Sequence, residues 1–192
     1  MVVYTSVRRH ARVLAAFAAA ASLTGAAVHS ATAAPTTALN RPALAKQILR
    51  TSGISLATIH PDRNHRNSHP ASTPKGNITD TANGKNALTS PWGDKANRRV
   101  PLDARMLNGM LKVRTQYNLR ISVSEIVGGD HSSNSRHYAG KAFDVNVING
   151  KHVGSGAPHK ALMSACRKLG ATEVLGPGDP GHKTHVHCAW PR

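Results

Sequence analysis

The sequence is poor in acidic and aromatic residues. Its 192 residues include only 9 Asp and Glu against 25 Lys and Arg, and aromatic side chains make up 4% of the chain. Proteins that bind nucleic acid by base stacking present aromatic side chains along a basic groove. We therefore expect no specific nucleic-acid partner, and the basic excess favours another kind of polyanion.

Long apolar runs are equally scarce. The single one, Val13–Val28, follows three arginines and precedes the small-residue stretch Ala31–Ala33. It is shorter than the roughly 20 residues of a membrane-spanning helix, so we interpret residues 1–33 as a signal peptide. The sequence thus predicts a secreted protein that has no membrane insertion after signal cleavage.

The charge that remains after this cleavage points to the surroundings of the protein. Loss of the three leader arginines leaves 22 basic residues against 9 acidic ones, a net charge of +13. For a secreted protein, an anionic cell-wall polymer is a better candidate partner than nucleic acid. Solubility alone stays open as the other explanation of this charge.

Cysteine is limited to one pair, Cys166 and Cys188. In an oxidising compartment an even pair predicts a disulfide, here between a helix and the last strand. Free thiols are the alternative. A metal-binding role for Cys188 is disfavoured, because it follows His187 directly and neighbouring strand residues point to opposite faces.

The N-terminal part, residues 34–99, has few clear elements. A short helix is predicted over 42–50 and a strand over 54–59. Between 60 and 97 the apolar periodicity disappears, and we interpret this stretch as a long polar loop or linker, partly disordered. Three histidines in it, His60, His65 and His69, are interpreted as surface residues, with a second metal site as the alternative.

Residues 100–192 have the patterns of a compact domain. Helical spacing of apolar residues predicts helices over 102–117 and 159–169. Alternation and β-branched residues predict strands over 119–127, 142–148, 151–153, 173–175 and 184–190. We therefore expect an α+β fold, with a small antiparallel sheet and flanking helices.

Four residues near the C-terminus form a candidate zinc site. His137 lies at the end of a loop, Asp144 in the strand that follows it, and His185 and His187 share one face of the last strand. A catalytic zinc ion takes three protein ligands and leaves one position open for water or substrate. The pattern thus predicts Zn²⁺ and a hydrolase, with the non-ligating histidine available to move a proton.

The same residues carry a family resemblance over about residues 100–192. The pattern Ser135-x-His137-x-x-Gly140-x-Ala142-x-Asp144, followed by His185-x-His187, resembles the zinc D-alanyl-D-alanine peptidases. The wider group includes the penicillin-insensitive murein endopeptidases, the lysostaphin-type enzymes and the Hedgehog signalling domain. The resemblance implies a monomeric peptidase with a Hedgehog-like fold that acts on peptidoglycan peptides.

Roles for single residues follow from this resemblance. It implies His137, Asp144 and His187 as the zinc ligands and His185 as the catalytic histidine. His182 matches a further active-site histidine of the murein endopeptidases. Ser135 and Arg136 are expected to bind the substrate. Ser135 is also expected to form a local hydrogen bond.

Two positions depart from the family pattern. Thr184 stands where many carboxypeptidases of the group have a carboxylate base, so the base is left to His185 or His182, or to a carboxylate from Asp179 or Glu173. The turn 128–131 lacks the arginine that binds the substrate's terminal carboxylate, for which Arg136 and Arg120 are candidate substitutes. Carboxypeptidase and endopeptidase activities both stay open, as does a non-catalytic, zinc-stabilised cell-wall-binding module.

Overall fold

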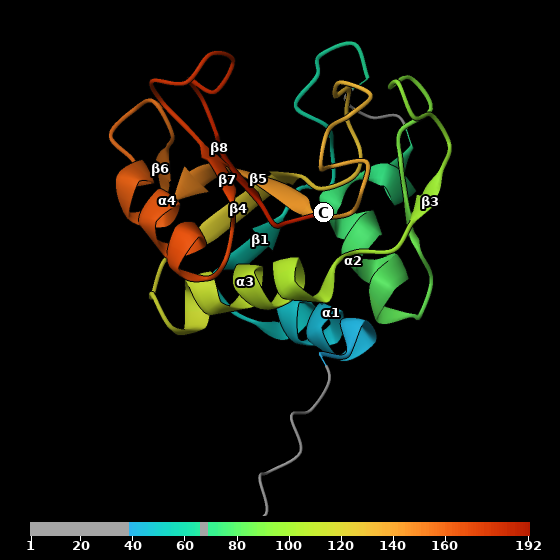
Figure 1. The fold of residues 1–192 in the computed structure, drawn as a ribbon, viewed down its shortest axis with the longest axis horizontal. Helices are drawn as coiled ribbons and strands as arrows, with labels where there is room; N and C mark the ends of the chain where they lie inside the picture. The colour runs from blue at the N-terminus through green and yellow to red at the C-terminus, as the bar shows by residue number, and fades with distance from the viewer. Residues whose placement is uncertain (1–38, 66–68) are drawn as a thin grey trace, which may run out of the picture. The chain divides into compact units, whose positions relative to one another are not determined.

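A mixed six-stranded β-sheet is the framework of the fold (Figure 1). The structure is a computed structural model and describes residues 39–65 and 69–192. Its strands run in the order β1-β4-β5-β8-β7, and β6 pairs with β5. Their bounds are β1 Ile54–Leu56, β4 Ile121–Glu125, β5 Ala142–Ile148, β6 Lys151–His152, β7 Glu173–Leu175 and β8 Val186–Ala189. The predicted signal peptide lies outside the described residues, and among the described residues no helix is long and apolar enough to cross a membrane.

The expectation of an antiparallel sheet is wrong at one edge. Strand β1 pairs with β4 in parallel, whereas β4, β5, β8 and β7 pair antiparallel. Parallel neighbours need a long crossover. Residues 57–120, which include two helices, supply it between β1 and β4.

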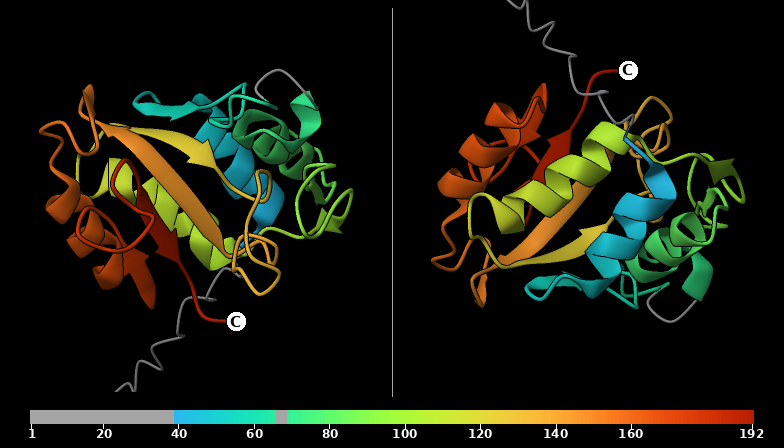
Figure 2. Two further views of the ribbon diagram at one scale, coloured as in Figure 1. Left: turned by 90° about the horizontal axis from the view of Figure 1, so that it is seen from above. Right: turned by 90° about the horizontal axis from the view of Figure 1, so that it is seen from below.

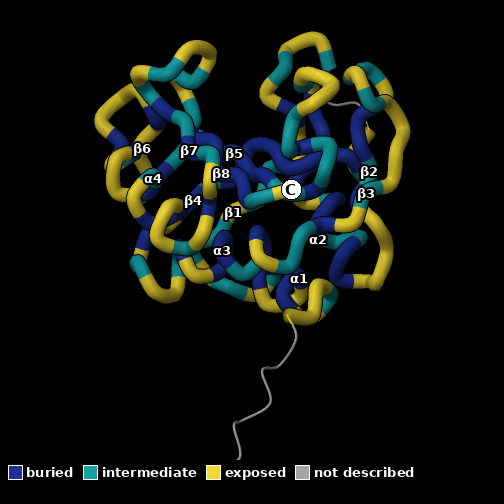
Figure 3. Tube along the Cα trace, in the orientation of Figure 1, coloured by how far each residue is buried: buried dark blue, intermediate teal, exposed yellow. Residues whose placement is uncertain are grey.

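Two helices cover one face of this sheet. Helix α1 (Arg41–Arg50) and helix α3 (Ala104–Thr115) lie side by side below it, as the right panel of Figure 2 shows. Helix α4 (His159–Lys168) packs against β7 and β8. The opposite face of the sheet is left to the connecting loops, which are mostly exposed (Figure 3).

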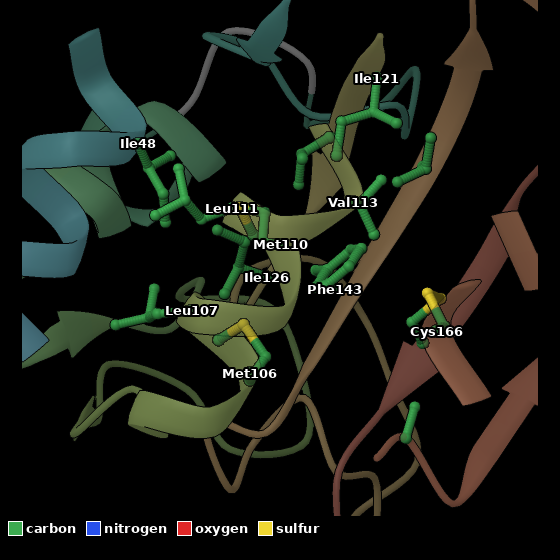
Figure 4. Packing of buried hydrophobic residues seen from close by; sticks show 14 of the residues in the cluster. Ile48, Met106, Leu107, Met110, Leu111, Val113, Ile121, Ile126, Phe143 and Cys166 are labelled. Carbon is green, nitrogen blue, oxygen red and sulfur yellow. A yellow bond between two sulfur atoms is a disulfide. The ribbon is translucent and has the colours of Figure 1, made fainter. Parts of the chain in front are cut away.

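The core lies between the helices and the sheet (Figure 4). Met106, Leu107 and Met110 of α3 and Phe143 of β5 are all fully buried in this core. Burial of each such side chain stabilises the fold by about 1.5–3 kcal/mol. The apolar stripe that predicted α3 is therefore core, and β5 is held firmly enough to present functional groups on its other side.

The interpretation of residues 60–97 as a loop is wrong over its middle part. This stretch contains α2 (Pro74–Ala82), which begins after the N-cap Thr73, a 3₁₀ turn (Pro70–Ser72) and β2 (Ala87–Leu88). Strand β2 pairs antiparallel with β3 (Arg99–Val100), which follows the stretch. The buried side chain of Asn77 donates to Ala71 O and Leu88 O and accepts from Val127 N. Because a polar residue connects α2 to the core, the stretch has little apolar periodicity to reveal the helix.

The predicted disulfide is present. Cys166 of α4 and Cys188 of β8 are bonded, with their Cα atoms 6.1 Å apart. Cys188 is buried in the core, on the face of β8 opposite the metal-site histidine that precedes it. The bridge therefore ties the strand that carries His187 to the helix behind it.

Candidate metal centre

Three side chains converge on one point above the sheet. His137 Nε2 lies 3.0 Å from His187 Nδ1 and 3.3 Å from Asp144 Oδ1, and the last two atoms are 3.0 Å apart. Ligands held about 2.1 Å from a tetrahedral zinc ion lie about 3.4 Å from one another. The predicted His137, Asp144 and His187 thus form one cluster whose donor atoms fit a zinc ion.

Pairing between two strands places two of these ligands. Asp144 of β5 and His187 of β8 are direct register partners. His137 comes from the loop before β5, where Gly140 has φ +69° and an added Cβ would lie 2.3 Å from Pro101 O. Only glycine fits there without strain, so Gly140 fixes how the loop returns His137 to the sheet.

Hydrogen bonds behind the two histidines fix their tautomers. His137 Nδ1–H donates to Ile126 O, and His187 Nε2–H donates to Glu173 Oε1 at 3.0 Å. Each ring therefore presents its unprotonated nitrogen to the shared point. Such outer partners orient metal ligands and raise their basicity.

The charges of the cluster are strongly coupled. Burial alone raises the pKa of Asp144, but His137 and His187 outweigh it and hold this pKa well below its usual value. Burial alone lowers the pKa of His137, but the Asp144 carboxylate outweighs it and raises this pKa. The cluster thus holds a buried carboxylate that favours positive charge beside it, which a divalent cation provides.

The cluster opens into a pocket of about 640 Å³. His182 and His185, the two predicted catalytic histidines, both line it, with ring centroids 4.8 Å apart. His185 Nε2 lies 3.9 Å from Asp144 Oδ2. His182 Nδ1–H donates to Pro180 O at 2.7 Å, which leaves its Nε2 free to accept a proton.

His185 precedes the first residue of β8 rather than lying within the strand. The expectation of a longer last strand is therefore wrong at this end, although His185 still reaches the site. Burial and the neighbouring histidines lower the pKa of His185. Its imidazole is consequently neutral near pH 7 and able to accept a proton.

A second pocket, of about 510 Å³, adjoins the first. Both are lined by His131, Asp144 and His185. The second pocket is also lined by Thr184, where the family pattern has a carboxylate. The site is therefore open on two sides of the three ligand side chains.

The two carboxylates proposed as substitute bases have different positions. Glu173 lines the first pocket, but its Oε1 accepts from His187, and its Oε2 lies 3.5 Å from Arg136 Nε. Asp179 accepts from Gly176 N and closes its own turn. Neither arrangement leaves a carboxylate free beside the open side of the cluster, so His185 and His182 are the best placed bases.

The residues predicted to bind substrate do not all lie in the same pocket. Arg136 and Ser135 line the first pocket, and Ser135 Oγ accepts from His137 N at 3.2 Å. Arg192 lines the same pocket. Arg120 does not, because it lies in a different pocket at the start of β4.

Two features of the site were not recognised in the sequence. His131 stacks on the ring of His137 with centroids 3.9 Å apart, and burial lowers the pKa of His131 to about 3. Behind them, His60 Nδ1 lies 2.9 Å from Glu125 Oε1, and both residues are buried. The interpretation of His60 as a surface residue is therefore wrong, and no local pattern relates two residues 65 positions apart.

Comparison with known proteins supports the zinc prediction. The chain is 37% identical over 106 residues to the zinc D-Ala-D-Ala carboxypeptidase of Streptomyces albus G. The match covers 54% of this chain and 35% of that protein. No protein-family model matches the chain.

Proposed function

We propose that this protein is a secreted zinc peptidase that hydrolyses amide bonds in peptidoglycan peptides. The observation that carries the proposal is the three-ligand cluster of His137, Asp144 and His187, open to a pocket that also holds two further histidines. Structural zinc sites are closed by four protein ligands, whereas catalytic sites keep a position open. The similarity to a zinc D-Ala-D-Ala carboxypeptidase supports the same class of substrate.

A zinc ion in this cluster would act as a Lewis acid on the scissile carbonyl and lower the pKa of water. The chain supplies the proton transfers. His185, neutral and beside the cluster, accepts the proton of the attacking water and returns it to the leaving amine. His182, next to His185, keeps its Nε2 available as a second proton acceptor beside His185.

The two adjoining pockets support binding of a peptide across the site. The first has the cations Arg136 and Arg192, which suit a free carboxylate. The second contains neither Lys nor Arg and gives the chain room on the other side of the cluster. We therefore expect both a terminal D-alanine and an internal cross-link to be cleaved.

The test uses purified, zinc-loaded protein with two peptides: one that ends in D-Ala-D-Ala, and one that is cross-linked without a free D-alanine terminus. Mass spectrometry of the products assigns the bond. The His185→Ala variant should keep one zinc ion per chain but lose activity about 10²–10⁴-fold, the usual range for a general acid–base. A parent protein that holds zinc and cleaves neither peptide would contradict the proposal and favour the zinc-stabilised, cell-wall-binding module.

A further inference from the structure

A third pocket lies at the far end of the sheet from the ligand cluster of His137, Asp144 and His187. It has a volume of about 550 Å³ and is formed where α1 leads into β1, α3 leads into β4, and β5 turns into β6. Strand β4 separates the two sites: its first residue, Ile121, lines this pocket, and its last, Glu125, pairs with Asp144. Four strand steps correspond to roughly 13 Å, so the pocket is distinct from the proposed active site.

Two arginines dominate this pocket. Arg114 and Arg120 both line it next to Gly53: a Cβ added there would lie 2.5 Å from Arg114 Nε and 3.1 Å from Arg120 Cγ. Gly53 has φ +90° and no side chain, which lets both arginine side chains lie across the backbone at this point. The glycine thus brings two positive charges together.

The two guanidinium groups have no carboxylate partner in the described part of the chain. Arg114 is fixed by neutral groups, since its Nε donates to Ser52 O at 2.9 Å and its Nη1 to Asn118 Oδ1 at 2.6 Å. The exposed side chain of Arg120 makes no hydrogen bond or ion pair with any other described residue. None of the 9 acidic residues lines the pocket. Two adjacent cations without a counterion favour an anionic ligand.

The remaining lining indicates which anion fits. The pocket is also lined by three serines, Ser52, Ser55 and Ser122. Guanidinium groups bind phosphate oxygens through paired N–H donors, and serine hydroxyls can donate to further oxygens. The volume exceeds that of one phosphate ion, so space remains for the polyol groups on either side of a phosphodiester.

We infer that this pocket binds a phosphate group within a polyol phosphodiester polymer, with Arg114 and Arg120 as the anion ligands. The inference rests on the pocket and its charges, independently of the proposed hydrolysis. Binding at this pocket would hold the strongly basic protein on a polyanionic surface through a defined site. The candidate metal centre would stay accessible to substrate. Charge at long range increases the rate of encounter, and the pocket adds local recognition.

Binding is tested by isothermal titration of the zinc-loaded protein with inorganic phosphate and, separately, with a short poly(glycerol phosphate), at two salt concentrations. The oligomer should bind at least tenfold more tightly than inorganic phosphate. Arg120→Gln should weaken oligomer binding at least tenfold, without a change in melting temperature, because the Arg120 side chain holds no other part of the fold. Arg98→Gln, at an exposed arginine outside the pocket, removes the same charge and should change binding less than twofold.

Two results would overturn the inference. Equal losses in Arg120→Gln and Arg98→Gln would show that net charge alone attracts the polymer. Equal affinities for phosphate and oligomer, both lost in Arg120→Gln, would replace the polymer by free phosphate as the ligand. Cleavage of a small soluble peptide is measured alongside and should not change in Arg120→Gln, so a failure of this inference is separable from a failure of the proposed function.

Discussion

We predict that Glu173 affects how tightly the cluster binds a metal ion, although it is not expected to be a ligand. Its carboxylate accepts a hydrogen bond from His187 Nε2–H at 3.0 Å. This hydrogen bond orients the ring so that Nδ1 of His187 points toward the ligand atoms of His137 and Asp144. Glu173→Gln keeps the shape and an acceptor oxygen but removes the charge. Loss of such an outer partner weakens metal binding 10–100-fold. Because the Glu173 side chain is 40% exposed, we expect the lower end of this range, about tenfold or about 1.4 kcal/mol.

Competition for zinc with a chromophoric chelator at neutral pH measures this change. Asp179→Asn is the matched control, because it removes the same charge from a nearby loop, where the carboxylate accepts from Gly176 N and does not contact the cluster. The control should bind zinc within twofold of the parent. If Glu173→Gln binds zinc as tightly as the control, the hydrogen bond from His187 does not orient its ring, and Glu173 has no part in metal affinity.

Three further predictions concern stability, each measured by urea denaturation. Asp103 caps α3 and pairs with Arg105 and Lys141, and these contacts outweigh burial and lower its pKa, so Asp103→Ala should cost about 2 kcal/mol at pH 7. Because the native pKa is depressed, this difference should persist above about pH 4 and shrink as the pH falls below it; a pH-independent difference would contradict the ion pair. Replacing Cys166 and Cys188 by alanine should cost about 3 kcal/mol for a bridge across 22 residues, and a loss under about 1 kcal/mol would contradict this. Gly140→Ala should cost about 2–4 kcal/mol from positive φ and a backbone clash, and an unchanged midpoint would refute that clash.

Local patterns were sufficient for the elements that surround the site. The Met and Leu spacing of 102–117 predicted α3, and alternation predicted β5 with its observed bounds. Between the predicted strands 142–148 and 151–153, Asn149 and Gly150 form the connecting turn, and both residues have positive φ. These signals succeed because each depends on the chemistry of residues that are close in the sequence.

Contacts between distant segments were beyond such patterns. The buried amide of Asn77 supports α2 where apolar periodicity is weak, and the parallel pairing of β1 with β4 depends on the long crossover of residues 57–120. His60 looked like one of several surface histidines, yet it is buried against Glu125. Whether a polar side chain is exposed or buried in the core depends on which segment packs against it. The residue type alone does not predict that segment.

By itself, the sequence predicted the composition of the candidate centre: two histidines and an aspartate as ligands, further histidines for proton transfer, and a cysteine pair to fix the last strand. The tertiary structure decided the rest. It placed Asp144 opposite His187, gave Glu173 to His187 as a hydrogen-bond partner, and placed Arg120 in a pocket apart from the candidate metal centre. The physical reason is that ligand chemistry belongs to each side chain, whereas the distances and orientations that make a site come from the packing of segments far apart in the chain.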